Sequence, residues 1–153
     1  MDYESQIEEY RRELLALSDK YGFNLYCEEI KHSAAFSFAE QLAINRRKRY
    51  INIDMPKDVR EVLRIPLDYS HPDNPIGYAR DQILQWHIRR EEYMYERATD
   101  RMNSATVAIV ICGDEHVARL KERFEKLGGR VEAESFRDKP WYRPDVFKME
   151  TYL

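Results

Sequence analysis

The amino-acid sequence predicts a single α/β domain, residues 1–153, with a mainly parallel sheet of about four strands and helices on both of its faces. Three observations support this fold class. Short apolar runs alternate with amphipathic stretches of ten or more residues, which is the pattern of parallel strands joined by crossover helices. A chain of 153 residues has the length of one ordinary domain. It contains only five glycines and no repeat, so ordered elements should follow one another closely.

The first two elements follow from the spacing of apolar side chains. Residues 4–20 should form an amphipathic helix that ends at Gly22, because apolar residues recur there at helical intervals. The apolar face of this helix consists of Ile7, Tyr10, Leu14, Leu17 and Tyr21. Residues 23–27 then have the composition of a strand, which stops at Glu28 and Glu29.

The middle of the chain repeats this alternation. Residues 33–49 should form a helix with Ser33 as its N-cap, and the basic residues at its end suit the negative C-terminal end of a helix. Residues 50–53 form the second predicted strand, which stops at Asp54. Pro56 should start a short helix, because its missing N–H is tolerated in a first helical turn.

Prolines then interrupt the chain before its longest helix. Three of them make residues 66–76 a loop. Residues 78–103 carry apolar side chains at helical spacing and predict one long helix. Residues 105–112 are almost continuously apolar, which is typical of a strand buried in a parallel sheet.

The last elements are predicted by their boundaries. Residues 115–127 should form a helix that Gly128 and Gly129 end. Residues 130–134 follow as the fourth predicted strand. Residues 137–153 are rich in aromatic residues and broken by prolines, so we expect an irregular tail packed across the domain.

Composition and charge exclude several classes of protein. A hydrophobic fraction of 43% excludes a disordered chain, and 35% charged residues predict a well solvated surface. A formal net charge of -3 argues against a domain built to bind nucleic acid, which is usually strongly basic. The longest apolar run, residues 107–112, is too short to span a bilayer. We therefore expect no membrane segment; a small-molecule or peptide ligand and a homo-oligomer both remain compatible with the sequence.

The cysteines and the first residues predict a compartment. The chain opens on acidic and polar residues rather than on the basic and apolar regions of a signal peptide. Cys27 and Cys112 are too few for a disulfide framework or a structural zinc site, and a reducing compartment suits two free thiols. These features predict a cytoplasmic protein.

Polar residues follow three of the predicted strands, where ligands bind in parallel α/β sheets. The first strand ends at Glu28 and Glu29, and the second ends at Asp54. After the third strand, Gly113 allows a tight turn, Asp114 can cap the next helix and His116 falls in its first turn. The candidate site residues at the strand ends are therefore Glu28, Glu29, Asp54, Gly113, Asp114 and His116.

Each of these residues also has a purely structural interpretation. Taken one at a time, the carboxylates fit solvated strand ends or helix caps better than a functional role, and a histidine in a first helical turn is commonly a surface residue. Cys112 fits a small buried strand residue better than a thiolate paired with His116. His87 falls on an apolar stripe and is expected to be a hydrogen-bonded core histidine.

The long predicted helix carries arginines on its apolar side. At 100° per residue, Arg90 lies between Ile83 and Met94 on the face expected to point into the protein. An inward guanidinium requires a carboxylate or an anionic ligand, because an unpaired buried charge costs several kcal/mol. We therefore predict that Arg90 pairs with a strand-end carboxylate, first Glu28 or Glu29 and then Asp54. Two further arginines of this side, Arg97 and Arg101, are expected to extend their charged ends to water.

The segment REEYMYERATDRMNSATVAIVICGDEHV, residues 90–117, resembles the C-terminal signature of the Tiki/TraB/GumN group. In that signature an arginine and a methionine on a helix precede an apolar strand and then G-x-x-H, and the matching positions are Arg90, Met94, Gly113 and His116. The segment LYCEEI is similar to a strand of the same group that ends in an acid, with Glu28 or Glu29 as the match.

This resemblance implies a metal-dependent hydrolase, peptidase-like as in the Tiki branch, with relatives that resemble erythromycin esterases. The group carries an earlier G-x-x-H on a first strand, and the residues before Glu28 contain none. An expected nitrogen donor is therefore missing, and one histidine with carboxylates is expected to hold a divalent metal weakly or not at all.

Three functional hypotheses follow. The first is a reduced Tiki/TraB-like hydrolase in which His116 acts with Glu28, Glu29 or Asp54, while Arg90 steadies a carboxylate or a developing anion. The second is a non-catalytic binding or assembly module that keeps the fold. A small nucleotide-binding domain is the third and has least support, because the turn after the third predicted strand lacks the repeated glycines that let backbone approach phosphates.

Overall fold

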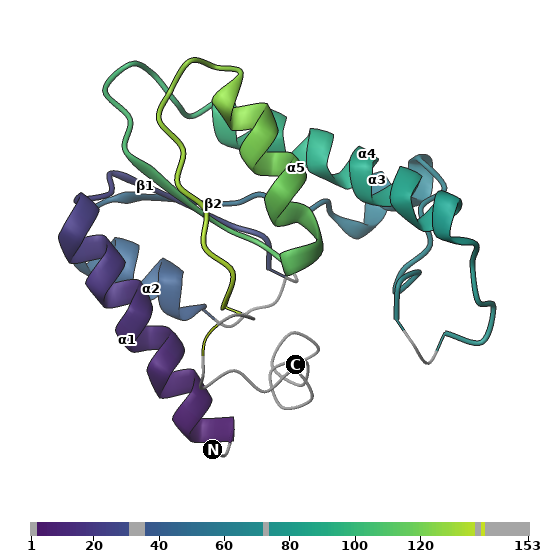
Figure 1. Cartoon of the computed structure of the whole chain (residues 1–153), viewed down its shortest axis with the longest axis horizontal. Coiled ribbons are helices and arrows are strands. Elements are labelled where there is room, and N and C mark those ends of the chain that lie inside the picture. The colour runs from purple at the N-terminus through teal and green to yellow at the C-terminus, as the bar shows by residue number, and fades with distance from the viewer. Residues whose placement is uncertain (1–2, 31–35, 72–73, 137–138, 140–153) are drawn as a thin grey trace.

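The computed structural model describes residues 3–30, 36–71, 74–136 and 139, and Figure 1 shows their arrangement. The elements follow one another along the chain as α1 (Tyr3–Tyr21), β1 (Leu25–Glu28), α2 (Phe38–Asn45), β2 (Arg49–Asn52), α3 (Lys57–Val62), α4 (Arg80–Thr99), β3 (Ala108–Ile111) and α5 (Asp114–Glu125). The described part of the chain therefore mixes helices and strands, as the sequence predicts.

The strands form a parallel sheet in the order β2-β1-β3. The central strand β1 pairs with both neighbours, so that Glu28 lies opposite Asn52 of β2 and Ile111 of β3. All strands therefore end at the same edge of the sheet. A parallel sheet is confirmed, and α2 connects β1 to β2 as expected of a crossover helix.

Side chains of β1 alternate between two hydrophobic clusters. Leu25 and Cys27 pack with Met94 of α4 and Leu120 of α5. Tyr26 packs instead in a cluster with residues of α1 and α2. Figure 1 shows α1 and α2 below the sheet in that view, and α4 and α5 above it. Because β1 is covered on both faces by these clusters, Leu25, Tyr26 and Cys27 do not alternate between a buried and an exposed side.

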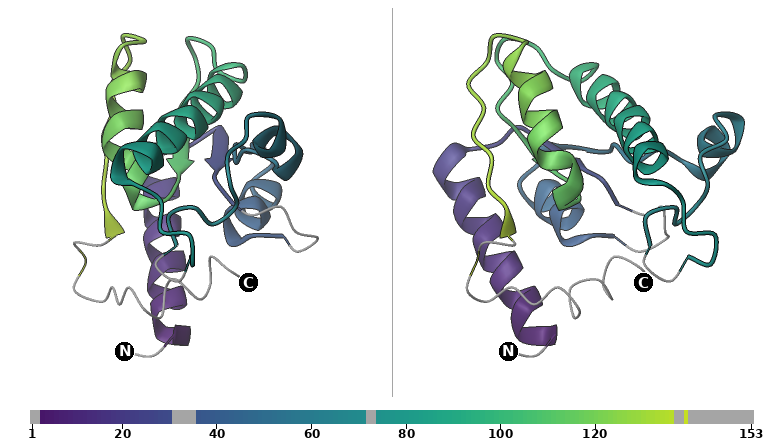
Figure 2. Two further views of the ribbon diagram at one scale, coloured as in Figure 1. Left: turned by 90° about the vertical axis from the view of Figure 1, so that its right-hand side faces the viewer. Right: turned by 45° about the vertical axis from the view of Figure 1, so that its right-hand side comes forward.

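A third cluster packs the segment between β2 and α4 against α4. Met55, Ile65 and Tyr69 are buried in it, and the half-buried Tyr78 and Trp86 pack around them. The helix α5 packs against α4, and in the right-hand view of Figure 2 it (green) lies between α1 (purple) and α4 (teal). The helix α4 is therefore held by the sheet, by α5 and by the loop that precedes it.

The predicted fourth strand is wrong. Residues 130–134 form no strand, although they are described by the structure. Val131 is the only one of these five side chains that is not exposed, so this segment buries too little apolar surface to align with the sheet. One of its polar side chains contacts α1 instead: the carboxylate of Glu132 accepts a hydrogen bond from the hydroxyl of Tyr21.

Both boundaries of the second predicted helix also differ from the prediction, since α2 spans Phe38–Asn45. The helix predicted over residues 33–49 begins only at Phe38, because Ser37 is its N-cap and accepts a hydrogen bond from the N–H of Glu40 at 3.1 Å. The predicted cap Ser33 and the tail predicted over residues 137–153, apart from Lys139, lie outside the described residues. Among the helices that the structure describes, none combines the length and apolar character needed to cross a bilayer.

Candidate functional site

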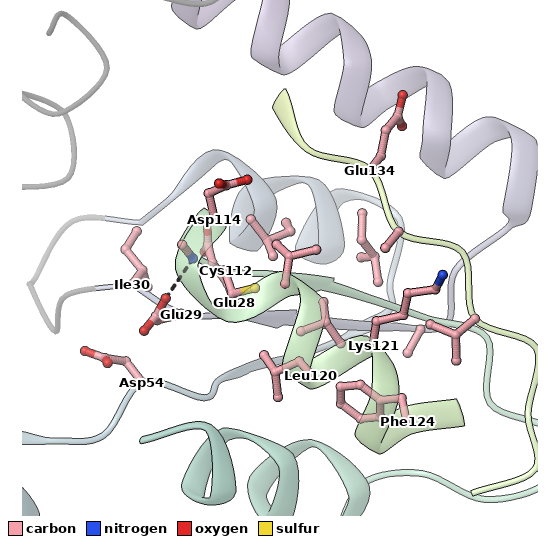
Figure 3. Close-up of a pocket in the computed structure, with 18 of the residues that line it drawn as sticks. Glu28, Glu29, Ile30, Asp54, Cys112, Asp114, Leu120, Lys121, Phe124 and Glu134 are labelled. Carbon is pink, nitrogen blue, oxygen red and sulfur yellow. Dashed lines mark hydrogen bonds between the residues drawn. The ribbon is translucent and has the colours of Figure 1, made fainter. Parts of the chain in front are cut away.

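The strand order makes the end of β1 the expected position for a ligand. The chain runs from β1 to β2 on one side and later returns to β3 on the other, and ligands of open parallel sheets bind at such a reversal of strand order. Glu29 follows β1 at this point, and its backbone N–H donates to the carbonyl of Ile111 at 2.8 Å. The N–H of Gly113 donates to Glu29 Oε1 at 2.8 Å, and Figure 3 draws this bond as a dashed line.

Arg90 of α4 bridges the carboxylates that follow two strands. One of its terminal nitrogens lies 2.6 Å from Glu29 Oε2 and 3.3 Å from Asp54 Oδ1. Only 12% of the Arg90 side chain is exposed, so the predicted inward orientation and both predicted partners are confirmed. Arg60 of α3 donates to the same oxygen of Asp54 at 3.0 Å.

His116 lies in the first turn of α5 and is fully buried. Its Nδ1 is 2.6 Å from Glu91 Oε2 of α4. Its Nε2 is 3.2 Å from Glu29 Oε2, but no described residue accepts a well-aligned hydrogen bond from this atom. The contact with Glu29 is thus mainly electrostatic, whereas the contact with Glu91 sets the orientation of the ring.

Glu91 is held from a second direction by Arg119 of α5. The Arg119 Nε and a terminal nitrogen donate to the two Glu91 oxygens, each at 2.7 Å. This fork arrangement is the strong, geometrically specific form of an arginine–carboxylate pair. We refer to the whole set as the charge network; its members are Glu29, Asp54, Arg60, Arg90, Glu91, His116 and Arg119.

The charge network shifts the pKa values of its two central groups in opposite directions. Burial alone would raise the pKa of Glu29, but the positive charges of His116 and Arg90 lower it to about 2. Burial alone would lower the pKa of His116, but Glu29 and Glu91 raise it to about 9. At neutral pH, Glu29 is therefore a carboxylate and His116 an imidazolium.

Glu28 does not belong to this site. Its carboxylate accepts hydrogen bonds from the hydroxyls of Ser37 at 2.5 Å and Tyr50 at 2.7 Å. These partners lie with α2 and β2, because successive residues of a strand point to opposite faces of a sheet. The placement of Glu28 beside His116 was one of two alternatives in the sequence, and Glu29 is the one that the structure brings there.

Gly113 and Asp114 differ from their predicted roles. Gly113 is the N-cap of α5 and has a φ of -59°, which any residue adopts, so the turn does not require a glycine conformation. Asp114 is the first residue of α5 rather than its N-cap, and its carboxylate accepts a hydrogen bond from the hydroxyl of Ser135. Figure 3 shows Asp114 on the far side of Cys112 from Asp54. Gly113 contacts the charge network through the hydrogen bond from its N–H to Glu29.

Sequence reasoning missed the second carboxylate of the site. Glu91 is 2% exposed and lies four residues after His87 and three before Met94 on the buried stripe of α4. This spacing was the available signal, since a carboxylate on an apolar stripe requires partners. Arg119 carries a similar signal, because it lies three residues after His116 on the same face of α5.

The prediction for His87 agrees with the structure, whereas Cys112 is not the buried strand residue that the sequence predicts, because it is half-buried and follows the end of β3. His87 is 8% exposed, and its Nδ1 lies 2.6 Å from the hydroxyl of Tyr69, which confirms a hydrogen-bonded core histidine. Cys112 is half-buried, and burial together with nearby carboxylates raises the pKa of its thiol. A thiolate nucleophile at Cys112 is therefore disfavoured.

The residues present do not fit the divalent metal ion that the family resemblance implies. Within the described ranges, no group of three or more His, Cys, Asp or Glu side chains is arranged to hold a metal. Both nitrogens of His116 face carboxylates, and the Arg90 guanidinium occupies the space between Glu29 and Asp54. A permanent organic cation thus stands where two carboxylates would share a metal.

The different surroundings of Glu28 and Glu29 lead to a direct test. We expect Glu29→Gln to lower the pKa of His116 from about 9 toward its ordinary value, because it removes the negative charge of one of the three carboxylates beside the ring, those of Glu29, Glu91 and Glu115. Glu28→Gln is the matched control and should leave the pKa of His116 near its value in the native protein. The side chain of Glu28 lies on the opposite face of the sheet, where it contacts Ser37 and Tyr50. NMR titration of the histidine ring signals measures both values. Equal pKa values in the two variants would contradict the assignment.

Comparison with known proteins gives no match to any protein-family model, curated protein or solved structure.

Proposed function

We propose that this chain is a reduced Tiki/TraB-like hydrolase in which Glu29 and His116 transfer protons without a metal ion. The observation that carries this proposal is the orientation of His116. A buried carboxylate, Glu91, holds Nδ1, while Nε2 faces Glu29 with no well-aligned acceptor. A carboxylate that fixes one ring nitrogen and leaves the other for reaction is the usual arrangement of a catalytic histidine.

The pKa values of the pair suggest which group is the acid and which is the base. His116 holds a proton at neutral pH, whereas Glu29 does not. In ester hydrolysis, water would attack the carbonyl carbon while Glu29 takes its proton. The bond to the leaving oxygen would then break as His116 Nε2–H donates its proton to that oxygen. Glu29 returns the proton to His116, 3.2 Å away, and both groups recover their starting states.

Arg90 is suited to two tasks in this reaction. Its terminal nitrogen keeps Glu29 ionised and oriented. Its Nε is buried and has no acceptor among the described residues, so this N–H is available to a developing oxyanion. A substrate would approach from the side of Glu29 and Asp54, because both line the pocket of Figure 3. His116 is fully buried, so the leaving oxygen would reach Nε2 only through a local opening beside Glu29.

We expect the protein to hydrolyse p-nitrophenyl acetate at a rate that EDTA does not change. His116→Gln should lower the rate about 100-fold, because it removes the general acid. Glu122→Gln is the matched control: Glu122 lies on the same helix as His116, its side chain is 71% exposed and pairs with Lys126, and its loss should leave the rate unchanged. Release of p-nitrophenolate measures each rate after dialysis against EDTA. A rate that EDTA abolishes, or one that His116→Gln leaves intact, would sink the metal-free mechanism.

A non-catalytic binding module is the second candidate. The observation that favours it is that each oxygen of Glu29 and of Glu91 already receives a donor from within the protein. A fully paired network can serve stability alone. If the native protein hydrolyses p-nitrophenyl acetate no faster than His116→Gln does, this second function is preferred.

A further inference from the structure

A chain of three polar groups extends from the charge network into the third hydrophobic cluster. Tyr69 is 2% exposed, and its hydroxyl lies 3.2 Å from a terminal nitrogen of Arg90 and 2.6 Å from Nδ1 of His87. The ring of His87 in turn meets the ring of His116 edge-to-face, with centroids 5.0 Å apart. Neither Tyr69 nor His87 has a part in the reaction described above.

The direction of these hydrogen bonds follows from what each group can donate. A guanidinium only donates, so the Tyr69 oxygen accepts from Arg90. The phenol proton then needs an acceptor, and the nearest is Nδ1 of His87. A neutral His87 that accepts at Nδ1 carries its proton on Nε2. The chain therefore has one direction, from Arg90 through Tyr69 to His87.

The surroundings keep both groups in the neutral forms that this direction needs. Burial lowers the pKa of His87, and the charge of His116 lowers it further. The other charged groups that act on His87 are Glu115, Arg90 and Glu91. Burial raises the pKa of Tyr69, so its hydroxyl keeps its proton at neutral pH.

We propose that Tyr69 and His87 are positioning residues that hold the Arg90 guanidinium against Glu29. With one terminal nitrogen bound to Tyr69 and the other to Glu29 and Asp54, the plane of the guanidinium is fixed. The tilted contact between the rings of Tyr69 and Trp86, with centroids 5.2 Å apart, holds the phenol in place. The loop before α4 thereby fixes the orientation of the Arg90 guanidinium, which in turn orients Glu29.

The test is the ring-nitrogen NMR spectrum of His87, which does not depend on any enzymatic activity. In the native protein we expect neutral His87 to carry its proton on Nε2, with Nδ1 as a hydrogen-bonded acceptor. Tyr69→Phe should give a mixture of tautomers and raise the pKa of His87, because the donor to its neutral form is gone. Tyr78→Phe is the matched control, since Tyr78 packs on Trp86 in the same cluster and should leave His87 unchanged.

Two results would overturn the proposal: a native His87 protonated on Nδ1, or a Tyr69→Phe spectrum identical to that of the native protein. The first needs no variant, so it holds even where Tyr69→Phe fails to fold. The activity readout rests on the proposed function. If the native protein hydrolyses p-nitrophenyl acetate, Tyr69→Phe should lower kcat on the order of 10- to 100-fold with little change in KM. If it does not, the hydrolase proposal fails while the NMR result still decides the role of Tyr69.

Discussion

Replacing Arg90 by alanine should lower the free energy of unfolding by about 3 kcal/mol. The variant leaves Glu29 and Asp54 without the cation that they share, and their side chains are only 10% and 9% exposed. Breaking a buried pair is costly because the remaining charge keeps its desolvation penalty and loses its partner. Denaturant unfolding at neutral pH measures the loss.

Two further variants sharpen this test. Arg89→Ala is the matched control, because Arg89 precedes Arg90 on the exposed face of α4 and should cost well under 1 kcal/mol. Arg90→Lys should give an intermediate loss, since an ammonium cannot bridge two carboxylates and a phenol in one plane. Equal and small losses for Arg89→Ala and Arg90→Ala would show that Arg90 contributes no more than a solvated arginine.

Raising the pH from about 6.5 to 9 should remove about 3 kcal/mol of stability that depends on His116. The folded protein raises the pKa of this group to about 9, because Glu29 and Glu91 stabilise the imidazolium. A group with a raised pKa contributes its full stability below its unfolded pKa, near 6.5. That contribution is then lost as the pH rises through the folded value.

The effect is isolated by comparison with His116→Gln. Other groups also titrate near pH 9, but they do so in both proteins, so the difference between the two unfolding free energies follows His116 alone. We expect this difference to shrink steadily from pH 6.5 to 9. A difference that is constant over this range would show that His116 is neutral in the folded protein, and would remove the general acid from the proposed mechanism.

The sequence was enough to predict that four residues lie close together: Glu29, Asp54, Arg90 and His116. Each part of that prediction depends on a local sequence pattern. Alternating strand and helix patterns predict a parallel sheet, and parallel strands end at one edge. Helical phase alone placed Arg90 on the inward face of α4. These inferences need only the periods of helix and strand, which short segments of sequence carry.

The choice between Glu28 and Glu29 required the packing of the sheet. Successive residues of a strand point to opposite faces, so only one of these acids can reach Arg90. Leu25, Tyr26 and Cys27 are all buried, through two different clusters. A strand that is apolar on both sides does not tell which side faces α4.

The sequence alone thus determined the fold class and the edge of the sheet at which the polar side chains lie. The tertiary structure decided which of these side chains pair with one another. Glu91 was predictable as a buried carboxylate but not as the partner of His116, since that contact depends on how α4 and α5 cross. Tyr69 contacts Arg90 from a loop, and the conformation of a loop cannot be predicted from a helix or strand periodicity. Residues 130–134 have strand-like composition, yet they bury too little surface to join the sheet. Contacts between distant parts of the chain decide which charges pair, how a loop runs and which segments join the sheet. Such contacts produce no periodic pattern in the sequence.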